Sequence, residues 1–247
     1  MPVARLKVWR GGDDGAYEDY EVEYEEGMVV LDVVHRLQAT QTPDLAVRWN
    51  CKAGKCGSCS AEINGRPQLQ CMQRMEQYPE DEVIQIAPLK TFPLIRDLVC
   101  DVSWNYKIAK TIPEFKLTDP DPDGNRRMAQ IDIDRGQEFR KCIECYLCQD
   151  VCHVIRDHPD NKDEFAGPRF FVQLANVAMH PLDTNTRRDT VDHGFGLEYC
   201  NITKCCTDVC PEHIKITDNA IIPLKERRVD EFYDPLRIIG RKFFGKK

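Results

Sequence analysis

Four cysteines lie within one short segment near the middle of the chain, Cys142–Cys152, and they constrain the fold more than any other feature. Their spacing is C-x2-C-x2-C-x3-C, which brings three thiolates of one loop to the same iron–sulfur cubane. In this spacing the fourth cysteine ligates a second cluster. The motif therefore predicts a pair of clusters and a second cysteine group elsewhere in the chain.

The second group follows near the C-terminus and consists of Cys200, Cys206 and the pair Cys210-Pro211. It repeats the first spacing, with Thr203 at the place of the second cysteine. The crossed pattern of two-cluster ferredoxins then predicts a complete 4Fe-4S cluster, because each loop lends its last cysteine to the other site. Its ligands are Cys142, Cys145, Cys148 and Cys210.

The reciprocal site receives only three cysteines, Cys152, Cys200 and Cys206. Its fourth position is Thr203, whose hydroxyl is a poor iron ligand. Three thiolates suit a 3Fe-4S cluster. Cys205 is an alternative fourth ligand, but it lies two residues from the required position, and we expect that offset to turn its side chain away from the cluster.

The N-terminal half contains a third arrangement, C-x4-C-x2-C-x11-C, formed by Cys51, Cys56, Cys59 and Cys71. This is the plant-type spacing for a 2Fe-2S cluster. Gly54 and Gly57 suit a loop whose backbone N–H groups approach sulfur closely. Zinc or unligated core thiols are the alternatives, but the long gap is poor geometry for a zinc knuckle.

Apolar periodicity around this motif predicts strands with one covering helix. Asn64-Gly65 indicates a hairpin turn that returns the chain toward Cys71. The expected first domain spans residues 1–103, where the strand pattern stops. Its expected elements are a hairpin of strands at 6–9 and 20–24, a helix over 30–37, and a last strand at 83–86.

The remaining residues, 104–247, predict a helical domain, so the expected fold class is α+β. Helical periodicity begins at Ile131 and returns at Phe170–Ala178, ending before Pro181. The segments 118–124 and 183–192 are expected to be solvated connections. Cys100 falls outside every motif and is expected to be a small buried apolar residue at the domain junction.

Charge and composition exclude some classes of protein. A formal charge of −7 and a pI near 5.5 argue against a general nucleic-acid binder. The N-terminal sequence has no apolar export segment, and no apolar run of about 18 residues could span a membrane. We therefore expect a protein of the reducing cytosol whose contact with a membrane comes through partners.

Together the cysteine groups resemble one family over essentially the whole chain: the iron–sulfur subunit of succinate dehydrogenase and fumarate reductase. The segment Ala87–Leu98 and the pair Gly167-Pro168 also resemble that family. The resemblance implies a plant-type ferredoxin β-grasp domain facing an FAD-containing flavoprotein subunit. It also implies a helical, bacterial-ferredoxin-like domain facing a membrane anchor with its quinone.

The implied electron path runs from flavin through 2Fe-2S, 4Fe-4S and 3Fe-4S to quinone, at the cytoplasmic face of a bacterial plasma membrane. This chain has no Gly-x-Gly-x-x-Gly motif and no set of residues for dicarboxylate chemistry, so succinate would be oxidised on the flavoprotein subunit. Other readings are fumarate reductase working in the opposite direction, the cluster subunit of a soluble reductase, and a zinc-stapled interaction protein.

The sequence departs from the family at the quinone end. The family's Pro, Trp and His positions hold His153, Asp157 and Asn201 here. We therefore take no quinone ligand from the family and name His153 and Asn201 only as candidate quinone-proximal residues. His153 is equally well explained as a structural hydrogen-bond donor. The basic tail 237–247 is a candidate for contact with anionic lipid, or a solvated end.

Overall fold

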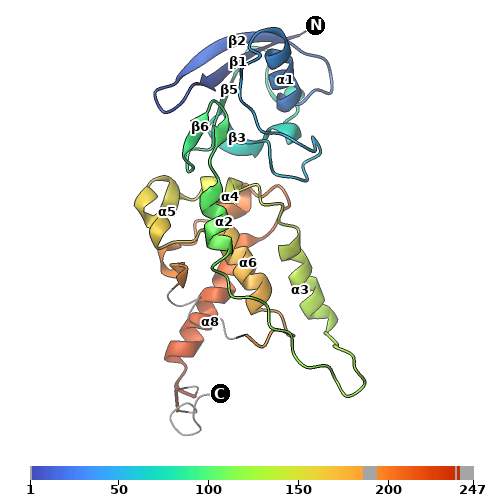
Figure 1. Cartoon of the computed structure of the whole chain (residues 1–247), viewed down its shortest axis with the longest axis vertical. Helices are drawn as coiled ribbons and strands as arrows, with labels where there is room; N and C mark the ends of the chain where they lie inside the picture. Colours follow the sequence, from blue (N-terminus) through green and yellow to red (C-terminus); the bar gives the residue numbers. More distant parts are fainter. Residues whose placement is uncertain (1, 186–193, 237, 240–247) are drawn as a thin grey trace.

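Strands fill the N-terminal part of the chain and helices fill the C-terminal part, as the expected α+β class requires (Figure 1). The computed structural model describes residues 2–185, 194–236 and 238–239. Its strands are β1 (Val3–Arg10), β2 (Ala16–Glu23), β3 (Ser60–Ile63), β4 (Arg66–Leu69), β5 (Val83–Ala87), β6 (Leu94–Arg96) and β7 (Val99–Cys100). Its α-helices are α1 (Val30–Thr40), α2 (Ser103–Ala109), α3 (Gln130–Arg140), α4 (Leu147–Asp150), α5 (His153–Arg156), α6 (Pro168–Ala178), α7 (Cys205–Asp208) and α8 (Ile222–Tyr233).

Short helical turns complete the described elements. They are η1 (Gln70–Met72), η2 (Met75–Gln77), η3 (Pro159–Asp163), η5 (Leu197–Tyr199) and the π-helical η6 (Ile216–Ile221).

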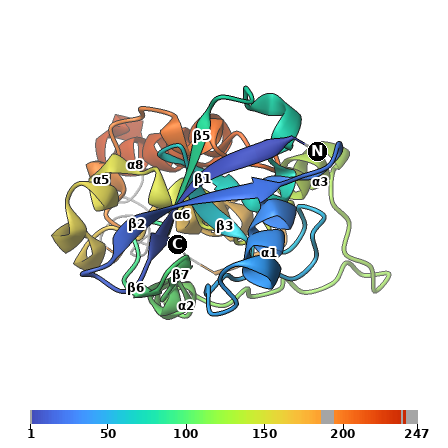
Figure 2. The same cartoon turned by 90° about the horizontal axis from the view of Figure 1, so that it is seen from above.

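A mixed sheet of order β2-β1-β5-β3-β4 carries the N-terminal unit. The pair β1–β5 is parallel and the other pairs are antiparallel. Alternate residues of β1, such as Leu6 and Val8, are buried, and α1 covers that face with Val30, Val33 and Leu37 (Figure 2). The predicted hairpin and helix are confirmed, because period-2 and period-3.6 patterns each bury one face.

The hairpin β3–β4 has the turn that Asn64-Gly65 predicts. Asn64 and Gly65 have φ of +50° and +74°, which is the pair of left-handed residues of a type I′ turn. The backbone N–H of Gln70 donates to the carbonyl of Cys59 at 3.1 Å, so Cys71 returns beside Cys59.

The prediction that β5 is the last strand is wrong. The strands β6 and β7 form a further hairpin, and each is too short to show an alternating apolar pattern. A buried carboxylate holds the hairpin in place: Asp97, in its turn, accepts N–H bonds from Gly11 at 2.6 Å and Ala46 at 2.8 Å. These long-range bonds leave no local mark in the sequence.

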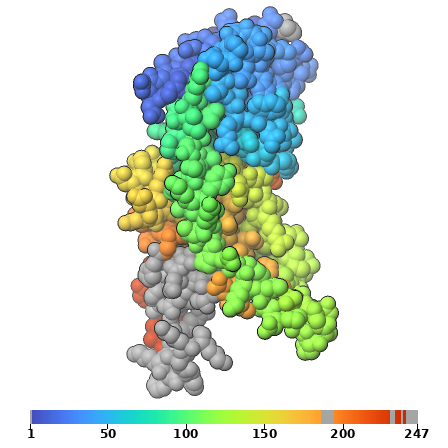
Figure 3. All heavy atoms as spheres, in the orientation of Figure 1, coloured from blue at the N-terminus to red at the C-terminus, as the bar shows by residue number. Residues whose placement is uncertain are grey.

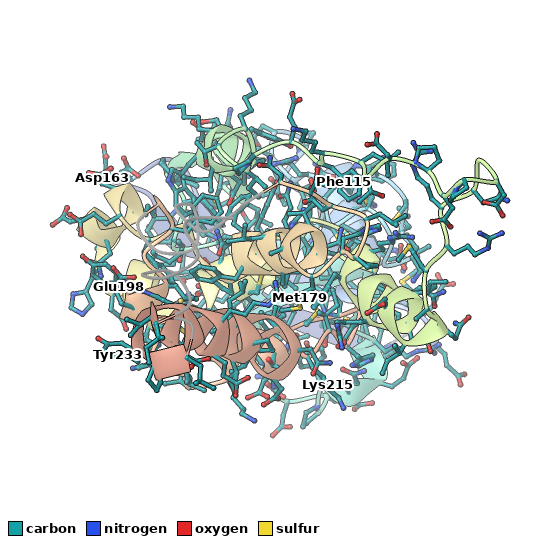
Figure 4. The ribbon with its side chains drawn as sticks, turned by 90° about the horizontal axis from the view of Figure 1, so that it is seen from below. Phe115, Asp163, Met179, Glu198, Lys215 and Tyr233 are labelled. Carbon is teal, nitrogen blue, oxygen red and sulfur yellow. The ribbon has the colours of Figure 1, made fainter. Side chains whose placement is uncertain are left out.

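Helix α6 is the centre of the C-terminal unit. Its apolar residues Phe170, Phe171 and Leu174 are fully buried, and it packs against η6, with α8 following on from η6 (Figure 4). The helical periodicity predicted from Ile131 onward and the helix predicted at Phe170–Ala178 are confirmed. The segment 118–124 is a surface loop, as predicted. The expected connection 183–192 and the basic tail lie mostly outside the described residues.

Polar contacts join the two units. Thr91 donates its N–H to the Asp150 carboxylate at 2.9 Å, and Arg156 pairs with both Asp150 and Glu62. The chain from β6 to α2 then runs from the upper unit down over the lower one (Figure 3). No helix in the described part of the chain has the length and apolar character needed to cross a membrane.

Candidate metal centres

The first cysteine group lies in a loop whose N–H groups point at sulfur. The N–H groups of Ala53 and Lys55 donate to Cys51 Sγ at 3.4 and 3.3 Å. Gly54 and Gly57 both have φ of +67°, which turns successive N–H groups to one side as in anion-binding nests. The role expected of both glycines is therefore visible in the loop.

The four thiols of the first cysteine group range from exposed to buried. Cys51 is exposed and Cys56 half-buried, whereas Cys59 and Cys71 are buried, with the Cys71 N–H donating to Cys59 Sγ at 3.5 Å. Burial raises the pKa of Cys59 to about 12. At Cys56 burial also acts upward, but hydrogen bonds from Cys51 and Ser58 outweigh it and lower the pKa to about 7.

A second set of thiols surrounds a cavity in the C-terminal unit, which we call the second cavity after this set. Cys142, Cys145 and Cys148 line it from the loop before α4 and from α4 itself, and Cys210 lines it from the distant second group. The Ile214 N–H donates to Cys210 Sγ at 3.4 Å. The structure thus brings together the four residues predicted for a 4Fe-4S cluster; their ligation stays a prediction.

A separate cavity is bordered by the third predicted set, Cys152, Cys200 and Cys206, together with Thr203, and we call it the third cavity after this set. Cys205 borders it too, with its Sγ 3.4 Å from Thr203 Oγ1. Cys205 therefore lies at the edge of this cavity, and the expectation that it is no ligand stays a prediction. Lys204, with φ of +65°, precedes α7, whose first two residues, Cys205 and Cys206, both line the cavity.

Burial dominates the electrostatics of these thiols. It raises the pKa of Cys145 and Cys152 to about 12 and of Cys206 to about 11, and it raises those of Cys148 and Cys210 as well. Neighbouring thiols add to the effect, since like charges oppose one another. Several such thiolates can coexist only beside compensating positive charge, which iron supplies.

The thiols border cavities rather than a single metal position. Among the described residues, no group of three or more His, Cys, Asp and Glu side chains is arranged to hold a single metal ion. Two of the predicted sets instead surround cavities, and N–H donors reach the Sγ atoms of Cys51 and Cys210. The donor set and the backbone N–H groups are those of iron–sulfur ligation.

The first and second sites touch through backbone. A Cβ built on Gly57 would lie 2.7 Å from the Cys145 Cα, so only glycine allows this approach. Ser60 Oγ lies 2.9 Å from the carbonyl oxygens of both Gly57 and Cys145. The loops that carry Cys56 and Cys145 are therefore adjacent. The sequence did not indicate Ser60.

The N-terminus of α6 lies between the second and third cavities. Pro168 borders the third and Arg169 the second. Buried Gln149 holds this end, because its amide donates to the Ala166 carbonyl at 3.0 Å and accepts from the Arg169 N–H at 3.3 Å. The Gly167-Pro168 pair marked this position in the sequence, but nothing marked Gln149 or Arg169.

The two residues considered for quinone contact differ in their surroundings. His153, the first residue of α5, borders the third cavity, whereas Asn201 is exposed and is not among the residues that line it. Neither placement tests contact with a quinone. Cys100 is buried at the junction of the two units, as expected, and burial raises its pKa to about 12.

Comparisons with known proteins agree with this arrangement. A model of the 2Fe-2S iron–sulfur cluster binding domain matches residues 2–107, and a model of the 4Fe-4S dicluster domain matches residues 138–214. The chain is similar to the fumarate reductase iron–sulfur subunit of Mycobacterium tuberculosis (strain CDC 1551 / Oshkosh), with 31% identity over 80% of each chain. It is also similar to the succinate dehydrogenase iron–sulfur subunit of Paracoccus denitrificans, with 27% identity over 92% of this chain and 89% of that one.

A solved structure described as the Mycobacterium smegmatis Sdh1 complex in the apo form contains a similar chain. The TM-score is 0.91 at 64% identity, over 95% of this chain and 98% of that chain. Some other curated relatives are longer, and this chain spans 41–45% of their length.

Proposed function

Because this chain belongs to the family of iron–sulfur subunits of succinate dehydrogenases and fumarate reductases, we propose that it is the electron-transfer subunit of a succinate dehydrogenase. Electrons would enter from the FAD of a flavoprotein subunit and leave to a quinone at a membrane anchor. The equivalent role in fumarate reductase, with the opposite direction, is the alternative.

The observation that carries the proposal is the order of the three thiol sites. The first touches the second through Gly57 and Cys145, and the second and third are joined by crossed chains, because Cys210 faces the second cavity and Cys152 the third. Three redox groups in this order would form a one-electron relay from the upper unit to the lower.

We assign the ligands as follows. Cys51, Cys56, Cys59 and Cys71 would hold a 2Fe-2S cluster; Cys142, Cys145, Cys148 and Cys210 a 4Fe-4S cluster; and Cys152, Cys200 and Cys206 a 3Fe-4S cluster. The N–H donors to Cys51 and Cys210 would stabilise thiolate charge, and burial would exclude water. The exposed hydroxyl of Thr203 leaves the third site without a fourth thiolate at the regular position.

We further assign the domains and their partners. Residues 1–103 would be a plant-type ferredoxin β-grasp domain that docks on the flavoprotein subunit, and residues 104–247 a bacterial-ferredoxin-like domain on the anchor. The position would be the cytoplasmic face of a bacterial plasma membrane. Exposure of residues 201–204 beside the third site supports this orientation, since an acceptor could approach there.

Iron and acid-labile sulfide analysis with EPR of the purified complex tests the proposal. We expect a 3Fe-4S signal in the oxidised state and a 2Fe-2S signal on reduction. A colourless, zinc-loaded protein would refute it. Loss of the oxidised signal alone would assign Cys205 as a fourth ligand, and Cys205→Ser would then restore that signal. Turnover with succinate and with fumarate, using quinones of different potential, would decide the direction.

A further inference from the structure

Arg169 is a buried cation beside the second set of thiols. Its side chain is 9% exposed, and it lines the same cavity as Cys142, Cys145, Cys148 and Cys210. A guanidinium stays charged in a protein, because its pKa lies far above neutral pH. A buried charge of this kind is costly unless nearby groups compensate it.

Its compensation within the chain is incomplete. One terminal nitrogen pairs with Glu144 Oε1 at 2.5 Å, but that carboxylate is half exposed, at 53%. The Arg169 Nε is buried and has no hydrogen-bond partner among the described residues. The guanidinium also lies 5.8 Å from the Phe170 ring, a contact that positions it without neutralising it. A buried N–H donor without a partner calls for an acceptor at this place.

The backbone fixes the position of this side chain. Arg169 is the second residue of α6, and its N–H is held by buried Gln149, the neighbour of Cys148. Nothing in the ligand spacing requires a cation at position 169, so ligation does not explain why a buried cation is present there.

We propose that Arg169 is a positioning residue that raises the reduction potential of the second cluster by placing a positive charge and an N–H donor against it. This rests on the proposed function. Reduction adds one electron, taken from the first site and passed to the third, so the reduced cluster carries one more negative charge. A fixed cation stabilises that state more than the oxidised one, and hydrogen bonds to sulfur act in the same direction.

Glu144 opposes this effect. Its carboxylate pairs with the same guanidinium and sits between two predicted ligands, so it adds negative charge at the loop. The pair therefore gives opposite predictions for its two members. Removing the cation should make the cluster harder to reduce, and removing the anion should make it easier to reduce.

The test is an EPR-monitored redox titration of the purified complex carrying Arg169→Met, Arg169→Lys or Glu144→Gln. We expect Arg169→Met to lower the equilibrium constant for one-electron reduction at least tenfold, which is 59 mV. Arg169→Lys should recover most of the loss, and Glu144→Gln should shift the potential upward. The potential of the 2Fe-2S cluster is the internal control and should not move.

Each possible result of this titration either supports or contradicts the role proposed for Arg169. An unchanged 4Fe-4S potential in Arg169→Met, or equal shifts of all clusters, would overturn the proposal. If Arg169→Met does not assemble the cluster, Glu144→Gln decides alone, since an unchanged or lower potential would contradict the role of the charge. If the unmutated complex shows no iron–sulfur signals, it is the proposed function that fails.

Discussion

The loop that begins at Cys142 and the loop that begins at Cys200 share a backbone and differ in their surroundings. In both loops, the residues immediately before and after the second ligand position have positive φ. The values are +56° and +61° around Cys145, and +63° and +65° around Thr203. Each loop then enters a four-residue helix, α4 or α7, and the last cysteine of each group lies beyond the end of that helix, four residues after the third ligand position. The second loop therefore holds Thr203 where the first holds Cys145.

Burial separates the two loops. All residues of α4 are buried, whereas only Cys206 of α7 is, and residues 201–204 are exposed. The first loop is covered by the N-terminal unit through Ser60 and Gly57. The backbone of both loops repeats the frame of a cluster site, while the side chain at one position and the covering unit decide what each site does.

Replacing Cys145 by the residue of the other loop, threonine, should have the largest effect on the first loop. In Cys145→Thr, the second site would acquire the composition of the third and lose one iron of its cubane. Under the proposed function, we expect electron transfer from succinate to quinone to fall about a hundredfold, the upper end for a disturbed metal site. Iron analysis and EPR of the oxidised complex measure the result. A full iron content with an unchanged signal would show that Cys145 is no ligand.

The reverse exchange, Thr203→Cys, should give a smaller effect. A thiolate at the regular position would complete a cubane in the third site, adding one iron and removing the oxidised 3Fe-4S signal. The cluster would become harder to reduce, and we expect quinone reduction to slow by about tenfold. Thr203→Ser is the control, because it keeps the hydroxyl. If Cys205 already supplies the fourth thiolate, Thr203→Cys would change neither the iron content nor the spectrum.

The features that could be predicted from the sequence are those that local spacing or a repeated spacing determines. The cysteines within one loop come together because their spacing is a property of short loops, Cys152 and Cys210 were placed by the crossed pattern of the repeat, and Asn64-Gly65 forms its turn because both residues accept positive φ. Features that depend on tertiary contact could not be predicted in this way. Ser60 reaches Cys145 across 85 positions, and Cys205 lines the same cavity as Cys206. Neither leaves a pattern in neighbouring residues.

Gly57→Ala tests whether the N-terminal unit holds the first loop in place. The added Cβ would lie 2.7 Å from the Cys145 Cα, at a backbone with φ of +67°. We expect the free energy of unfolding to fall by about 1–3 kcal/mol from backbone strain, and further because the loop is displaced. Chemical denaturation, monitored by the absorbance of the clusters, measures this change. Gly65→Ala is the matched control: its φ is also positive, at +74°, but its Cβ would meet open space. Equal losses in the two variants would contradict the contact.

Ser60→Ala sharpens the same contrast with the smallest change. The hydroxyl has one hydrogen and lies 2.9 Å from two carbonyl oxygens, so it donates to one of them at a time. Its loss should cost about 0.5–1.5 kcal/mol, the usual value of a net hydrogen bond. The same denaturation experiment measures it. Thr111→Ala is the control, because it removes an exposed hydroxyl that donates to the nearby Ile108 carbonyl.

The hydrogen bond to the Cys145 carbonyl links Ser60 to the second site, so removing the hydroxyl should speed the release of the proposed 4Fe-4S cluster and leave the third cluster unchanged. Parallel release of both would mean that the N-terminal unit stabilises the two loops alike.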